Sequence, residues 1–196
     1  MNMPQNIEAQ LREAAPSGIR FVSDTDVKGV TTAWCTLAAR AELLGAAATL
    51  KSAGARLSTI TVFQPKAPDA PSVKEGETPP AAPVFFGGIE IDGQAYEIDY
   101  HFDLDGDTLT LVVHAPAGGA VDSLTPLFRG ADWPEREIME IYALEVRNHP
   151  DPRRLFLDAG IENAVLERLI PLSTLTNSAT TKGLWEKIMA QTEKTS

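Results

Sequence analysis

The sequence contains a single cysteine, Cys35, among its 196 residues. One cysteine cannot build a disulfide framework, a four-cysteine iron–sulfur site or a zinc ribbon within this chain. No run approaches the ~18 to 20 consecutive apolar residues of a transmembrane helix, and the first residues lack the basic-then-apolar order of a secretory signal. These absences predict an intracellular protein without metal or other cofactors of its own, which would meet a membrane only through partners.

Basic residues are also few, with 17 Lys and Arg against 27 Asp and Glu and a formal net charge of −10. Nucleic acids and anionic membrane surfaces require a basic field, so both are poor partners. The sequence has no Walker loop, no GxGxxG after a strand and no GxSxG elbow, so it indicates neither nucleotide binding nor nucleophilic catalysis. Cys35 follows Trp34 in an apolar stretch, which predicts a buried, inert thiol.

Hydrophobic residues make up 43% of the chain, enough for one domain with a core. In the first half the pattern predicts helices over residues 6–15 and 37–53, with Gly54 placed to end the second one. It predicts strands over residues 19–23 and 56–63, and the β-branched content of the second favours a strand covered on both faces.

Residues 64–83 contain six prolines and form a long loop or arm inside the domain. Such a segment is either an interaction element or a solvated insertion. A C-terminal helical arm over 159–196 follows the domain proper, residues 1–158. In that arm Leu184, Trp185 and Ile188 have helical spacing, so it can cap its own core or dock in a partner's groove.

The clearest β signal lies in residues 84–116, where Asp92-Gly93 and Asp105-Gly106 are both strong hairpin turns. A two-residue loop at the second turn pairs residue 104 with 107 and residue 100 with 111, and sets Glu97 opposite His114. This register gathers the apolar side chains on one face. The elements together predict an α+β domain with a mainly antiparallel sheet and helices packed on one face.

The most informative segment is residues 131–158, here called the signature segment. Asp132 and Glu135 have capping-box spacing around Pro134, which predicts a helix start at Asp132. The apolar positions then recur at three- and four-residue spacing as far as Val146, and the intervening charges are typical of an exposed face. Pro150 and Pro152 stop the helix and stiffen the exit.

The signature segment resembles that of the 30 kDa subunit family of respiratory complex I, whose pattern reads approximately EREVYDMFGI and then GHPDLRRIL. The positions that match outright are Glu135, Arg136, Glu137, His149, Pro150, Asp151, Arg153 and Arg154. The departures are Glu140 for Asp, Tyr142 for Phe, Ala143 for Gly, Asn148 for Gly and Pro152 for Leu. Members usually continue into a GHPLRKDYP-like tail, whereas this chain continues AGIENAVLERLIPL, which is more similar to the corresponding subunit of Ech-type energy-converting hydrogenases.

The resemblance implies a non-catalytic, peripheral-arm subunit of a membrane-bound NADH dehydrogenase or energy-converting hydrogenase. It would be cytoplasmic, on the inner face of the cell membrane, and would dock on the large subunit that holds the quinone site or the nickel–iron centre, near the iron–sulfur subunits. The expected contact surface comprises Glu135, Arg136, Glu137, Glu140, His149, Asp151, Arg153 and Arg154.

Three alternatives to this surface stay open. The helix can be an ordinary surface helix with solvated charges. The chain can be a small acid/base enzyme that uses Glu137, Glu140 and His149, or a free-standing orphan paralogue that folds without a complex.

Overall fold

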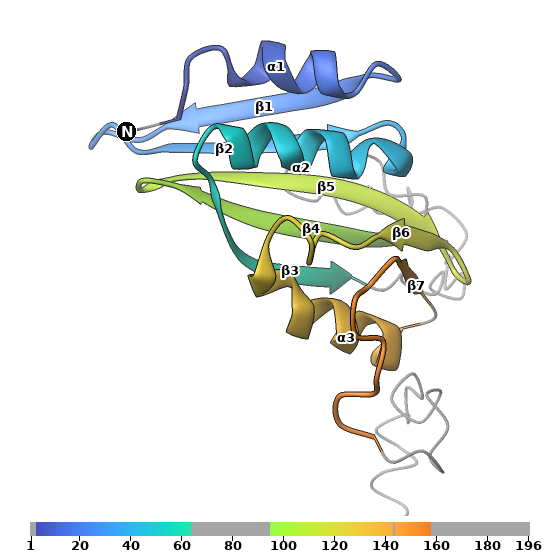
Figure 1. The fold of residues 1–196 in the computed structure, drawn as a ribbon. Coiled ribbons are helices and arrows are strands. Elements are labelled where there is room, and N and C mark those ends of the chain that lie inside the picture. Colours follow the sequence, from blue (N-terminus) through green and yellow to red (C-terminus); the bar gives the residue numbers. More distant parts are fainter. Residues whose placement is uncertain (1–2, 64–94, 143, 158–196) are drawn as a thin grey trace, which may run out of the picture.

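The computed structural model describes residues 3–63, 95–142 and 144–157. A five-stranded sheet forms its centre, with the strands in the order β1-β2-β5-β4-β3 (Figure 1). The strands are β1 (Ile19–Thr25), β2 (Thr31–Leu37), β3 (Arg56–Phe63), β4 (Ala95–Leu104) and β5 (Asp107–Pro116). Neighbouring strands are antiparallel except β2 and β5, which are parallel. The sheet is therefore mixed but mainly antiparallel, and the predicted α+β class is confirmed.

The hairpin formed by β4 and β5 has the predicted register. Leu104 pairs with Asp107, and Glu97 lies opposite His114. Asp105 and Gly106 have φ angles of 59° and 103°, the two positive values that a two-residue type I′ turn requires. Since side chains alternate along a strand, the register turns the apolar residues of both strands toward one buried face.

Three α-helices within the described residues cover this apolar face: α1 (Ile7–Ala14), α2 (Leu43–Ser52) and α3 (Asp132–Ile141). One buried cluster joins a residue from each helix to the centre of the sheet; it includes Leu11, Leu50, Ile138 and Tyr100. In Figure 1, α1 and α2 lie side by side, and α3 lies next to β3 at the other edge of the sheet. The helices thus pack on one face, as the sequence predicts.

Two aromatic contacts fix α3 to strand β4. Phe128, just before the 3₁₀ turn η2 (Arg129–Ala131) that leads into α3, meets Phe102 edge-on at 5.3 Å between ring centroids. Tyr142, just after the helix, meets Tyr96 in the same manner at 5.9 Å. A second, parallel pair of short strands, β6 (Ala120–Asp122) and β7 (Glu145–Arg147), brings the chain on either side of α3 together. Both ends of the helix are therefore held in place.

Several helix boundaries differ from the sequence-based prediction. The helix expected over 37–53 starts only at Leu43, after a 3₁₀ turn η1 (Arg40–Glu42), because Thr31–Leu37 forms β2, which the pattern did not predict. Gly54 ends this helix as predicted, with a φ of 87°. The apolar helical face predicted as far as Val146 is wrong: Tyr142 is already extended, and Val146 pairs with Val121 in the β6–β7 ladder.

Strand β3 has the predicted bounds, but the prediction that both its faces are covered is wrong. Within the described sheet it is an edge strand with a bulge between Leu57 and Thr59, and Ser58 and Thr59 are exposed. Its β-branched residues therefore reflect strand propensity rather than burial on two sides. The proline-rich segment 64–83, the strand and turn expected over 84–93, and the C-terminal arm 159–196 lie outside the described residues.

Candidate functional site

Helix α3 begins at Asp132 as predicted, but the predicted capping box does not form. The N-cap position is Ala131, and within the described residues no side-chain cap hydrogen bond forms there. The turn η2 leads directly into α3, so the backbone is already helical at Ala131. Glu135 is then free to face the interior instead of reaching back to the helix start.

Glu135 is fully buried, with 0% of its surface exposed. Its carboxylate accepts hydrogen bonds from the Ser123 hydroxyl at 2.5 Å, the Leu124 amide at 2.5 Å and the Thr125 hydroxyl at 2.8 Å. A buried carboxylate is tolerated when such donors replace water. Glu135 therefore ties α3 to the segment that follows β6.

His149 lies beside this carboxylate, and its side chain is also fully buried. The ring Nδ1 accepts a hydrogen bond from the Asp151 amide at 3.0 Å, so the proton of the neutral ring resides on Nε2. That nitrogen lies 3.3 Å from the Thr125 hydroxyl, 3.5 Å from Asp132 and 3.6 Å from Glu135. The histidine thus joins the start of the Pro150–Pro152 loop to α3.

Glu140 holds the other end of that loop. It is 2% exposed, and its two oxygens accept hydrogen bonds from the amides of Leu155 at 3.2 Å, Phe156 at 2.8 Å and Leu157 at 2.6 Å. Burial opposes the charged form, but these amides and the nearby charge of Arg154 outweigh it and keep the pKa of Glu140 below its ordinary value. The carboxylate stays ionised and serves as an anchor for three consecutive residues.

Arg136 fixes the middle of the loop from the same helix. Its Nε donates to the Arg153 carbonyl and its Nη2 to the Arg154 carbonyl, both at 2.8 Å. Its Nη1 lies 3.8 Å from Asp151. The planar fork of arginine suits this paired contact, which a lysine could not reproduce.

Asp151 and Arg153 pair with each other on the outer side of the loop. Both oxygens of Asp151 accept from Arg153, each at 2.6 Å. This paired hydrogen bond holds the pKa of the Asp151 carboxyl well below its ordinary value. The Arg153 side chain remains 81% exposed.

The structure therefore divides the predicted contact surface in two. Glu135, Glu140 and His149 are buried, so the prediction that they are exposed for docking is wrong. The spacing of the charges resembles a solvated helix face, but backbone amides and hydroxyls of distant residues draw these three groups inward. Half-buried positions are Arg136 and Asp151, and exposed ones are Glu137, Arg153 and Arg154.

The arrangement does not favour the acid/base alternative. Glu140 accepts hydrogen bonds from loop amides, and His149 is hydrogen-bonded to the Asp151 amide and the Thr125 hydroxyl, while Glu137 lies exposed on α3. A general acid or base needs access to a substrate, which the two buried groups lack. Among the residues that the structure describes, no group of three or more His, Cys, Asp or Glu side chains could hold a metal ion.

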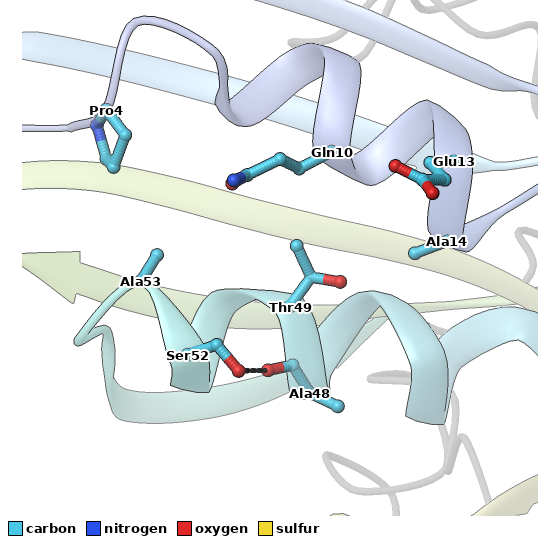
Figure 2. A pocket seen from close by; sticks show the side chains of 8 residues that line it. All are labelled: Pro4, Gln10, Glu13, Ala14, Ala48, Thr49, Ser52 and Ala53. Atoms are coloured by element: carbon cyan, nitrogen blue, oxygen red, sulfur yellow. Dashed lines mark hydrogen bonds between the residues drawn. The ribbon is translucent and has the colours of Figure 1, made fainter.

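A groove of about 520 Å³ lies elsewhere, between α1 and α2 (Figure 2). Among the described residues that line it, Glu13 is the charged one, and the Ser52 hydroxyl donates a hydrogen bond to the Ala48 carbonyl at 3.0 Å. The groove is otherwise lined by Pro4, Gln10, Ala14, Thr49 and Ala53. These described lining residues do not form a catalytic set of groups.

Cys35 is buried as predicted, and burial raises the pKa of its thiol to about 12. It is therefore protonated and unreactive at neutral pH. None of the described helices is both long and apolar enough to cross a lipid bilayer.

Two aromatic residues of the signature segment were missed in the sequence. Trp133 and Phe156 are 61% and 60% exposed and contact each other. Trp133 lies one helical turn before the exposed Glu137 and on a different face of α3 from the buried Ile138. Helical spacing alone therefore predicts that Trp133 is exposed. Phe156 carried no such signal, because its position depends on the Glu140 anchor.

The fold and the site define a small α+β domain in which signature charges fix a loop against a helix instead of forming a catalytic centre. The chain belongs to the family described as respiratory-chain NADH dehydrogenase, 30 Kd subunit, whose model matches residues 37–175.

Similar proteins carry related names. The NADH-quinone oxidoreductase of Mesorhizobium japonicum has a subunit, designated C, that is 42% identical over 65 residues, which are 33% of this chain and 32% of that protein. The first curated relatives are thus matched over about a third to less than half of their length.

Two solved structures are also similar. A trypsin-resistant fragment of Nqo5 has a TM-score of 0.45 at 17% identity and covers 75% of this chain and 99% of the fragment. A chain of the membrane-bound sulfane sulfur reductase, an archaeal respiratory membrane complex, has a TM-score of 0.49 at 12% identity. The match covers 90% of this chain and 92% of that chain.

Proposed function

We propose that this chain is a non-catalytic subunit of a membrane-bound respiratory complex of the NADH dehydrogenase or energy-converting hydrogenase type. It docks on the large subunit that carries the quinone site or nickel–iron centre and reaches the membrane through its partners. Family membership supports the kind of complex. The hydrogenase type is favoured by the residues after Asp158, which resemble the corresponding subunit of Ech-type hydrogenases.

One observation carries the docking role: two charged side chains of the signature segment, Glu140 and Arg136, fix the loop after β7. Glu140 holds three of its amides and Arg136 two of its carbonyls. A loop fixed in this way loses little conformational freedom when a partner binds, so more of the contact energy appears as affinity. The same residues have no free acid, base or ligand atoms left for chemistry.

The exposed guanidinium of Arg153 is the polar contact we assign to the partner. Its Nε and Nη2 are bound to Asp151, and within the described residues its Nη1 has no hydrogen-bond partner. A partner carboxylate can bind that open edge as a charge-assisted hydrogen bond. Arg154 is exposed on the same loop and adds positive charge.

The test is to tag the protein in its native cell, solubilise the membranes gently and identify what purifies with it while hydrogen and NADH turnover are assayed. Co-purification of a large subunit and membrane subunits with either activity supports the proposal and selects the type of complex. Recovery of the chain alone would contradict it and favour the orphan paralogue.

The polar contact is tested separately with an Arg153→Ala, Arg154→Ala double variant. We expect less of the complex to be recovered, and we expect the Arg153→Ala single variant to keep the melting temperature of the isolated wild type, because the Arg153 side chain is 81% exposed. Equal recovery from the wild type and the double variant would remove these arginines from the interface.

A further inference from the structure

The exposed aromatic residues of the signature segment form a patch that the docking role above does not use. Trp133 on α3 and Phe156 on the loop are 61% and 60% exposed. Their rings meet edge to face, with centroids 5.9 Å apart and planes at 85°. We call these two rings the aromatic patch; Arg153 lies three residues before Phe156 on the same loop.

Other exposed large apolar residues of the described chain lie elsewhere. Val22, Val27 and Val30 belong to the β1–β2 hairpin, and Phe63 ends β3. Trp133 and Phe156 come from segments 23 residues apart in the sequence and still meet, so the patch is a product of the fold.

The backbone beneath both rings is fixed. The Phe156 amide donates to Glu140 at 2.8 Å, and the amides on either side of it do the same. Trp133 stands in the first turn of α3, which Phe128 and Tyr142 hold against β4 at its two ends. Large rings held in place before binding are the side chains that dominate interface energetics, since they bury much area at low entropic cost.

The charge on the loop that carries Phe156 indicates the kind of partner. Arg153 is 81% exposed and keeps its Nη1 edge open, and Asp151, which pairs with it, is also within 3.8 Å of Arg136. Arg153 therefore presents an exposed cationic edge on a chain whose formal charge is −10. A surface of this kind complements an acidic segment better than a second copy of the same acidic chain.

We propose that the aromatic patch is the apolar anchor of the docking surface, and that it receives a partner-subunit segment in which an apolar side chain stands next to a carboxylate. The apolar side chain packs against Trp133 and Phe156, and the carboxylate binds the open edge of Arg153. This inference rests on the proposed function, because the partner is another subunit of the same complex.

The experiment compares the native complex purified from cells that carry tagged wild type, a Trp133→Ala, Phe156→Ala double variant, or Trp133→Phe. We expect at least a tenfold loss of co-purifying large subunit for the double variant and near wild-type recovery for Trp133→Phe. Val27→Ala, at a fully exposed apolar position away from the patch, is the control and should change nothing. Thermal melting of each isolated chain should be unchanged, since the removed rings are mostly exposed.

A photo-crosslinking residue at position 133 then identifies what lies on the patch. A crosslink to a partner peptide with an apolar residue beside Asp or Glu is the expected result. Unchanged recovery of the double variant, or crosslinks to lipid alone, would overturn the inference while wild-type co-purification leaves the proposed function standing. If the wild type itself purifies alone, both fail together.

Discussion

Replacing Glu140 with glutamine tests whether this carboxylate holds the loop. The charged group accepts three amide hydrogen bonds, with Leu157 on one oxygen and Leu155 and Phe156 on the other. Glutamine offers a single acceptor oxygen, so at least one bond is lost and an NH₂ group faces an amide that can only donate. A hydrogen bond to a charged group contributes about 1.5–3 kcal/mol, so we expect the loop to open more easily by about 2–3 kcal/mol.

Amide hydrogen exchange measures this opening directly. A change of about 1.4 kcal/mol is a factor of ten in an equilibrium, so residues 155–157 should exchange about 30- to 140-fold faster in Glu140→Gln. Amides in the centre of the β4–β5 hairpin should keep their wild-type rates. Glu137→Gln removes an exposed charge from the same helix and is the control. Equal exchange at 155–157 in the wild type and Glu140→Gln would refute the anchoring role.

Three further changes test other parts of the structure. Arg136→Lys replaces a fork that bonds two carbonyls with a point charge, so limited proteolysis should cut the 150–157 loop faster than in the wild type; an unchanged rate would contradict this. The Tyr100 hydroxyl is buried without a hydrogen-bond partner among the described residues, so Tyr100→Phe should leave the free energy of unfolding unchanged or raise it by about 1–2 kcal/mol, and a loss of stability in urea unfolding would reveal an unseen partner. Burial and the charge of Glu97 raise the pKa of Asp99 from 3.8 to about 7. As the pH rises, the Asp99 carboxyl therefore ionises in the unfolded chain before it does so in the folded chain. The free energy of unfolding should fall between about pH 4 and about pH 7, by up to about 4 kcal/mol. Asp99→Asn should flatten this part of the curve of stability against pH.

Local signals predicted much of the fold. The two-residue turn at Asp105-Gly106 correctly predicted the β4–β5 register, and Gly54 correctly predicted the end of α2. Both features require positive φ angles, which few residue types adopt readily, so the local sequence reports them. Strand β2 and its parallel pairing with β5 were missed. That pairing joins residues about 75 positions apart in the sequence, and no local periodicity reports it.

The candidate site was predicted in its position but not in its geometry. The sequence predicted that Glu135 and Glu140 are solvated charges, because their spacing on α3 is typical of an exposed helix face. Their true partners are hydroxyls and amides of residues 123–125 and 155–157, which only the folded chain brings close. The exposed Arg153 was predicted correctly, since a charge on a loop that follows two prolines needs no distant partner to remain in solvent.

The most direct test of the docking role is the stoichiometry of this chain in solubilised native membranes separated by size under native conditions. We expect the chain to migrate with the large and membrane subunits of one complex, in equal molar amount, with no major fraction at its own mass of 21.1 kDa. If most of the chain migrates as a free protein of that mass while the complex is intact and lacks it, the docking role is wrong.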